Sequence, residues 1–215
     1  MSEVFELDCP FNKDYYERGP ELGISCYRDY RWIPELTISM AMTMIDYLNI
    51  TRDQTILDFG CSKGFLVKAL RLLYRQAWGV DISPYAISNV DSAVEDYCFL
   101  KGEMENIPDV FDFCIAKDVF EHINPTDLCF ELEELKARCL FAIIPLGRNG
   151  EYTAPLNNCD VTHVICHDED WWMSFFKDSD WKPITFTFKI SGIKDHYYDK
   201  YPRAHGFFFL ENIRY

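Results

Sequence analysis

Apolar positions along the chain follow two alternating patterns. Continuous apolar runs are short and recur at 56–59, 77–81, 97–100, 110–116 and 139–144. Between them the apolar residues take a helical period, and helices are predicted from Pro34, from Phe65, after Ser83 and from Pro125. Continuous apolar strands separated by helices are typical of a parallel sheet whose two faces are both covered, so we predict an α/β fold.

The clearest helical stripe follows Pro34. It consists of Leu36, Met40, Met44, Ile45 and Leu48, spaced so that they share one face of a helix. Core packing explains this methionine-rich stripe without any ligand.

The two ends of the chain lack this regularity. Residues 1–34 are rich in Tyr, Arg, Pro and Gly, and predict an irregular N-terminal cap with one helical turn. The last third has a polar loop at 147–160, a helix starting near Asp168, and β-rich runs at 184–190 and 205–212. Two strands joined without a helix either pair antiparallel or sit apart. We therefore expect one domain, 1–215, with a cap (1–34), a cofactor-binding core (35–146) and acceptor-side elements with the last two strands (147–215).

Composition narrows the functional classes. The formal net charge is −14, and no Lys/Arg cluster could bind phosphates locally, so we expect no nucleic-acid partner. The nine cysteines are scattered and form no C-x-x-C pair, which favours reduced thiols over disulfides or a zinc site. No apolar run is long enough for a membrane span and the start lacks the features of a signal peptide, so we expect a soluble, cytoplasmic protein.

The stretch that points to a ligand is 55–70, TILDFGCSKGFLVKAL. A strand that enters a helix through a glycine-bounded turn lets the chain approach a ligand closely, beside the unpaired N–H groups of the helix start. A dinucleotide site requires G-x-G-x-x-G, but Ser62 and Phe65 replace its second and third glycines. A P-loop requires G-K-[ST], which does not follow this turn.

A second interpretation of the turn is a hydrolase nucleophile elbow, G-x-S-x-G, formed by Gly60, Ser62 and Gly64. Asp118 and either His163 or His205 follow in the order of a Ser…Asp…His triad. However, the turn follows the first strand of the predicted sheet, and no oxyanion loop precedes it. A serine hydrolase using Ser62 is therefore kept as a remote alternative.

The third interpretation uses the residues downstream. The pattern D-x-G-x-[GS]-x-G, from Asp58 to Gly64, resembles motif I of the class I S-adenosylmethionine-dependent methyltransferases, and is similar to the small-molecule type 11 and type 23 members. Asp81 ends the second strand, the pair Glu103–Met104 follows the third, and FDFCIAKDVFEHI (111–123) resembles the fourth-strand motif. The likeness covers about 54–146, and residues 160–172 resemble the segment after strand five. Ser62 stands where the motif usually has a glycine. We expect the serine to be tolerated if its φ is negative, and to weaken the cofactor site otherwise.

The resemblance implies a Rossmann-like doubly wound sheet, mostly parallel and seven-stranded with one antiparallel strand, and helices on both faces. It also implies S-adenosylmethionine as cofactor. The carboxylate of Asp81 would accept the ribose hydroxyls, and Glu103–Met104 would take the adenine. The full expected cofactor set is Asp58, Gly60, Cys61, Ser62, Gly64, Phe65, Asp81, Ile82, Glu103, Met104, Lys117, Asp118 and Arg31.

The expected reaction is methyl transfer to a hydroxyl of a sugar or natural product. His163 is the first candidate for a general base because it follows strand five at the carboxyl edge of the sheet, with His122 and Asp118 as further catalytic candidates. The acceptor-binding candidates are Tyr16, Tyr30, Trp32, His163, His196 and Tyr197.

Two further expectations complete the sequence-based picture. No metal site is expected, because Asp118 with His163, His167 or Asp160 lacks a tight ligand spacing. We expect a monomer or homodimer acting on a small-molecule acceptor. The alternative is a non-catalytic binding or regulatory protein of the same fold.

Overall fold

A computed structural model describes residues 9–215. The first eight residues of the predicted cap lie outside this range. Residue contacts divide the chain into two compact units, one up to Pro108 together with Cys159–Thr162, and one of Asp109–Asn158 with His163–Tyr215.

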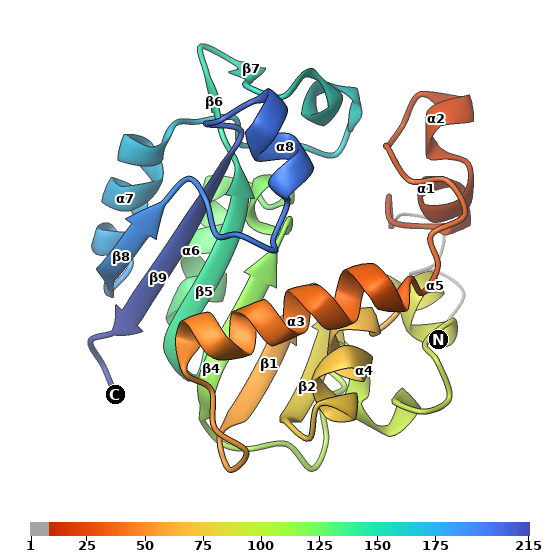
Figure 1. The fold of residues 1–215 in the computed structure, drawn as a ribbon, viewed down its shortest axis with the longest axis vertical. Coiled ribbons are helices and arrows are strands. Elements are labelled where there is room, and N and C mark those ends of the chain that lie inside the picture. The colour runs from red at the N-terminus through yellow and green to blue at the C-terminus, as the bar shows by residue number, and fades with distance from the viewer. Residues whose placement is uncertain (1–8) are drawn as a thin grey trace. The chain divides into compact units, whose positions relative to one another are not determined.

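The first unit holds three parallel strands and most of the helices of the predicted cofactor core (Figure 1). Its elements are α1 (Lys13–Glu17), α2 (Gly19–Leu22), α3 (Pro34–Leu48), β1 (Thr55–Phe59), α4 (Phe65–Leu72), β2 (Gln76–Asp81), α5 (Pro84–Ser88), the 3₁₀ turn η1 (Glu95–Tyr97) and β3 (Cys98–Leu100). β2 pairs with β1 and with β3, so the strands that carry the turn and Asp81 are neighbours.

Helix α3 begins at Pro34, whose fixed φ suits the first helical position, and ends at Asn49 in a left-handed cap. Met40, Met44 and Leu48 are buried along one face, as the apolar spacing predicts. Leu36 was placed wrongly in this stripe: it is 58% exposed. It lies in the first turn, where Thr37 takes the buried position and bonds back to the Ile33 carbonyl.

The second unit carries the remaining strands. Its elements are β4 (Phe111–Lys117), the 3₁₀ turn η2 (Phe120–His122), α6 (Pro125–Glu134), β5 (Ala137–Pro145), β6 (Gly147–Arg148), β7 (Glu151–Tyr152), α7 (Glu169–Asp178), β8 (Trp181–Thr187), α8 (Asp195–Lys200) and β9 (His205–Asn212); the 3₁₀ turn η3 (Pro155–Cys159) ends at the boundary of the unit. β5 runs parallel to β4, and β9 runs antiparallel to both β5 and β8.

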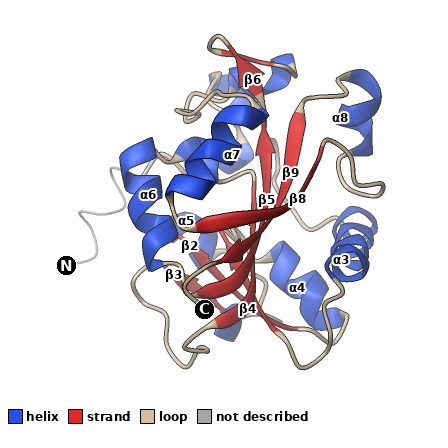
Figure 2. Cartoon of the chain, turned by 90° about the vertical axis from the view of Figure 1, so that its left-hand side faces the viewer, coloured by secondary structure: helices blue, strands red, loops and turns tan. Residues whose placement is uncertain are grey.

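Together the strands have the order β3-β2-β1-β4-β5-β9-β8. β9 is the one antiparallel strand of this seven-stranded sheet, and helices flank the strands, as Figure 2 shows for α6 and α7. The predicted Rossmann-like fold class is confirmed.

The last third differs from its sequence-based prediction in three places. β8 starts at Trp181 instead of 184, because the Trp181 ring is buried and its Nε1 donates to the Leu132 carbonyl. The connection to β9 contains α8, a helix too short to show a period. The loop predicted from 147 contains the hairpin β6–β7, which turns at Asn149–Gly150 with both residues at positive φ, a known hairpin signal.

The apolar core of the second unit lies under β5 and β9. Phe208 is fully buried, with its ring 4.9 Å from Phe186 and 5.5 Å from Phe176 between ring centroids. All nine cysteines lie in the described range, and none of them forms a disulfide there. None of the helices within residues 9–215 has the length and apolar character needed to cross a bilayer.

The backbone of the glycine turn after β1 is left-handed at three residues, Gly60 (φ 79°), Ser62 (φ 52°) and Gly64 (φ 72°). The N–H groups of Gly60 and Cys61 both donate to the Val80 carbonyl, at 2.8 and 3.0 Å, which ties the turn to β2. A Cβ at Gly64 would lie 2.7 Å from Cys98 Sγ, so glycine is required there by space as well as by φ. Ser62 therefore has positive φ, the conformation in which a serine at this position is expected to weaken the cofactor site.

Replacing Phe208 with Ala is expected to lower the free energy of unfolding by about 3–5 kcal/mol, because it opens a cavity in a packed aromatic core. The matched control is Phe130→Ala, a residue 61% exposed, with an expected change within about 0.5 kcal/mol. Urea unfolding followed by circular dichroism measures both. A loss below about 1 kcal/mol for Phe208→Ala would contradict the described core.

Replacing Ser62 with Gly is expected to raise the free energy of unfolding by about 0.5–1 kcal/mol, because glycine adopts positive φ without a Cβ penalty. Replacing Gly64 with Ala is expected to lower it by more than about 1 kcal/mol, because strain and the Cys98 contact add. Thermal and urea unfolding of the two variants provide the comparison. Equal effects of the same sign would show that the turn has a different backbone.

Candidate functional site

In the first unit, Asp81 is the polar group that closes the glycine turn. Its Oδ2 accepts the Ser62 N–H at 2.7 Å and its Oδ1 accepts the Ser83 N–H at 2.8 Å. Burial raises the pKa of this carboxyl, and the backbone N–H groups oppose that shift. Each carboxylate oxygen has two acceptor positions, so Asp81 can hold the turn and still accept a hydrogen bond from a ligand hydroxyl at each oxygen.

The segment after β3 lies beside Asp81. Lys101 N–H donates to the Asp81 carbonyl at 2.8 Å, and Glu103 N–H donates to the Leu100 carbonyl at 2.9 Å. Ile82 and Met104, predicted to contact the cofactor, are 50% and 37% exposed. This part of the candidate site therefore presents apolar and acidic side chains to solvent next to a buried carboxylate. That combination suits a nucleoside, with an apolar base and hydroxyls that donate.

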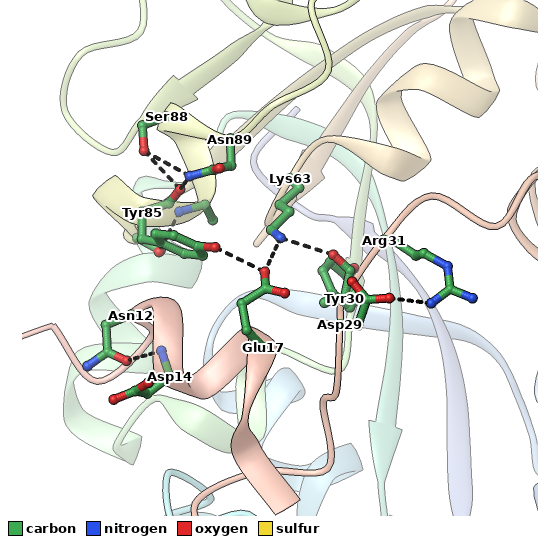
Figure 3. Close-up of polar contacts among 12 residues, drawn as sticks. Asn12, Asp14, Glu17, Asp29, Tyr30, Arg31, Lys63, Tyr85, Ser88 and Asn89 are labelled. Atoms are coloured by element: carbon green, nitrogen blue, oxygen red, sulfur yellow. Dashed lines mark hydrogen bonds and ion pairs between the residues drawn. The ribbon is translucent and has the colours of Figure 1, made fainter. Parts of the chain in front are cut away.

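The described part of the N-terminal cap contacts the same turn through Lys63. Lys63 is buried, and its Nζ lies 2.5 Å from Glu17 Oε1 and 3.0 Å from the Tyr30 carbonyl (Figure 3). Glu17 also accepts the Tyr85 hydroxyl at 3.0 Å. A lysine inside the turn thus fixes α1 and the residue before Arg31 to the candidate cofactor site. Sequence reasoning missed Glu17 and Tyr85 as partners, because no local pattern links them to the turn.

Four residues of the cap were predicted to bind ligands, and each contacts other side chains of the first unit. Tyr16 is buried, and its ring centroid lies 5.5 Å from that of Tyr30 and 6.0 Å from that of Tyr85. Burial, followed by the charge of Asp81, raises the pKa of its hydroxyl. Tyr30 and Trp32 pack on the Phe65 ring, with centroids 5.2 and 5.9 Å apart. Arg31 forms an exposed ion pair with Asp29.

In the second unit, β4 ends at a buried ionic cluster. Asp118 has left-handed backbone (φ 56°), and its two oxygens lie 2.7 Å from Lys117 Nζ and 2.7 Å from Lys194 Nζ. Burial opposes its ionisation, but the two ammonium groups hold the pKa of Asp118 well below its usual range. Asp118 is therefore an anion already matched by two cations.

His205 and Tyr197 belong to the same cluster. His205 Nε2 lies 3.0 Å from Lys194 Nζ, and burial with the charge of Lys194 lowers the pKa of His205 to about 2. The Tyr197 ring meets the His205 ring edge-on at 4.8 Å and also contacts His196 at 4.5 Å. No local pattern links Lys194 to Asp118, because the two residues are 76 positions apart and meet only in the folded chain.

A second group in this unit contains His163 and His122, whose ring centroids are 4.6 Å apart. His163 Nδ1 lies 2.9 Å from the Asn157 carbonyl, and its Nε2 lies 4.0 Å from Oε1 of the fully buried Glu121. Burial, and then the charge of Asp118, raise the pKa of Glu121 well above its usual range. The structure thus brings the two predicted histidines together and adds Glu121, the acidic half of the E-H pair.

Comparison with known proteins shows similarity to methyltransferases. A family model described as a methyltransferase domain matches residues 57–136. Two curated relatives, the ribosomal protein L11 methyltransferases of Glaesserella parasuis and Escherichia coli, are 28% identical over 120 residues and 44% identical over 112 residues. These matches cover 53% and 52% of this chain, but only 38% and 31% of the relatives.

Solved structures share the fold at low identity. The mitomycin 7-O-methyltransferase MmcR has a TM-score of 0.60 and 16% identity, covering 83% of this chain and 54% of that one. The geranyl diphosphate C-methyltransferase of Streptomyces coelicolor A3(2) has a TM-score of 0.59 and 14% identity, covering 97% and 89%. Residues 57–136 therefore match a methyltransferase domain, and the chain has the fold of these solved methyltransferases.

Proposed function

We propose that this chain transfers a methyl group from S-adenosylmethionine to a hydroxyl of a small molecule. The observation that carries the proposal is Asp81, a buried carboxylate at the end of β2 that closes the glycine turn and retains acceptor capacity. The cofactor expected from the sequence is confirmed at the level of the family, because the matching model describes a methyltransferase domain. The geranyl diphosphate C-methyltransferase was solved with S-adenosyl-L-homocysteine, the demethylated product of the same cofactor.

In this proposal the first unit binds the donor. Asp81 accepts the ribose hydroxyls, Glu103 and Met104 take the adenine, and the turn from Gly60 to Gly64 lies along the methionine end. S-adenosylmethionine has no phosphate, so close backbone approach suffices and no cluster of cations is needed. Asp58, Cys61, Phe65 and Ile82 lie on the strands, turn and helix of the same unit. The sequence-based expectation that Lys117 and Asp118 also contact the cofactor stays a prediction. Arg31 is the least supported of the proposed cofactor contacts, because its guanidinium already forms an ion pair with Asp29.

The second unit supplies the groups that prepare the acceptor. Methyl transfer is an in-line displacement, so the acceptor oxygen must be aligned, dehydrated and relieved of its proton. His163 and His122, beside Glu121, form the group proposed to act on that proton. Asp118 is proposed to position acceptor-side residues through Lys194 and His205, and Tyr197 and His196 extend that cluster toward the acceptor.

Specific observations bear on two alternatives to this function. A protein acceptor is favoured by the curated relatives, which are all ribosomal protein L11 methyltransferases, although their matches span at most 38% of their length. The serine hydrolase is disfavoured, because within residues 9–215 Ser62 Oγ forms no hydrogen bond with a histidine, which a serine nucleophile requires as its base.

Calorimetry with S-adenosylhomocysteine tests the donor site. We expect saturable binding to the wild-type chain and at least tenfold weaker binding to Asp81→Asn, because a carboxylate that accepts two hydroxyls is replaced by a neutral amide. The control is Asp96→Asn, an exposed carboxylate of the same unit, with unchanged affinity. Thermal unfolding shows that each variant is folded. No binding at about 1 mM ligand, or equal affinity of wild type and Asp81→Asn, would contradict the site.

A labelled-methyl assay tests the acceptor class. Sugars, phenols, small acids and ribosomal protein L11 are offered in parallel, and we expect transfer to a hydroxyl-bearing small molecule. His163→Ala should lower kcat by about 100-fold or more while S-adenosylhomocysteine affinity is unchanged, as for a group that acts on the acceptor proton. Transfer to the protein alone would replace the proposed acceptor. Donor binding without transfer to any acceptor would favour the non-catalytic alternative.

A further inference from the structure

Glu121, His122 and His163 place three metal-binding atoms close together in the second unit. One carboxylate oxygen and one ring nitrogen from each histidine all lie within 4.8 Å of one another. Neither oxygen of Glu121 has a hydrogen-bond partner within the described residues, although the side chain is fully buried. A buried carboxylate without hydrogen bonds is costly, and a bound proton or a bound cation would offset that cost.

The hydrogen bond of His163 determines which of its ring nitrogens can bind a cation. The Asn157 carbonyl only accepts hydrogen bonds, so at 2.9 Å it requires the proton of His163 on Nδ1. In the neutral ring, Nε2 then presents a lone pair, and it lies 4.0 Å from Glu121 Oε1, beyond hydrogen-bond distance. Two electron-pair donors separated in this way are bridged well by a cation, because metal–nitrogen and metal–oxygen bonds are each about 2.0–2.2 Å long.

The surrounding backbone holds this geometry. The Glu121 carbonyl accepts N–H groups from Val164 at 2.8 Å and Ile165 at 3.1 Å, which fixes the segment after His163 against η2. The contact from His163 Nδ1 to a carbonyl is the outer interaction that orients metal-binding histidines. The nearby ammonium groups of Lys117 and Lys194 are bound to Asp118.

We propose that Glu121, His122 and His163 bind a first-row divalent transition-metal cation. Two imidazoles and one carboxylate are ligands suited to Zn²⁺, Mn²⁺ or Fe²⁺, whereas Mg²⁺ and Ca²⁺ prefer oxygen alone. Three protein ligands leave a coordination position for water or an acceptor oxygen, whose pKa the cation would lower. Only this last role rests on the proposed methyl transfer. The sequence-based expectation of no metal site considered Asp118 with His163, His167 or Asp160, and did not include Glu121.

The test is metal titration of the full chain after treatment with a chelator. Co²⁺ is the optical probe, followed by its visible d–d absorption, and Zn²⁺ is titrated by calorimetry. We expect one equivalent of Co²⁺ per chain, displaced by Zn²⁺. Glu121→Gln and His163→Ala should each weaken binding at least tenfold. The matched controls, Glu134→Gln and His167→Ala, should bind as the wild type does.

Two further measurements on the same samples make each outcome decisive. Thermal unfolding establishes that a variant is folded, and Glu121→Gln is expected to fold because it removes a buried charge. S-adenosylhomocysteine affinity establishes the state of the donor site. Folded wild-type protein that binds S-adenosylhomocysteine but no Co²⁺ or Zn²⁺ would overturn the metal site and leave the proposed function standing. Metal binding that survives both ligand substitutions, or that His167→Ala removes, would overturn the assignment of the ligands.

Discussion

The hydrogen bond from the Ser62 N–H to the Asp81 carboxylate is the interaction on which the candidate donor site depends. It holds a serine in left-handed backbone between two glycines, and it aims the carboxylate at the turn instead of at solvent. Because β1 and β2 are parallel neighbours, the turn after one strand and the last residue of the other meet at the same edge. One carboxylate therefore shapes the turn and provides the acceptor that a ribose would need.

Two buried carboxylates in the second unit have opposite environments. Asp118 lies between two ammonium groups and stays ionised. Glu121 lies close to His122 and His163, and burial raises its pKa. The first anion is part of a neutralised ionic cluster. Glu121 has no such cationic partner within the described residues, so its carboxylate can bind a proton or a cation. This difference separates a group that positions its neighbours from a group available for chemistry.

Local patterns explain what the sequence could predict. The strand, turn and helix from Thr55 to Leu70 follow from continuous apolar residues, glycines and a helical period within one short stretch. Asp81 and the first strands follow in the same way, and the antiparallel β9 was predicted with its observed bounds, His205–Asn212. The fold class could therefore be predicted before any contact was known.

Contacts between distant residues explain what the sequence could not predict. Lys194 meets Asp118, Glu17 meets Lys63, and His163 meets Glu121 only after the chain has folded. Leu36 has the spacing of a buried residue, but Thr37 takes that position. The environment of Ser62 likewise depends on Asp81 of the next strand. The functional chemistry of this chain lies mostly in such pairings, which is why its motifs indicated the cofactor more readily than the acceptor.

The most direct test of the donor site is a crystal structure of the chain with S-adenosylhomocysteine. We predict electron density for the nucleoside beside β2, with both ribose hydroxyls within hydrogen-bond distance of the Asp81 carboxylate and the Ser62 N–H still bound to Oδ2. Density for the ligand elsewhere, or a ribose that does not contact Asp81, would contradict the account.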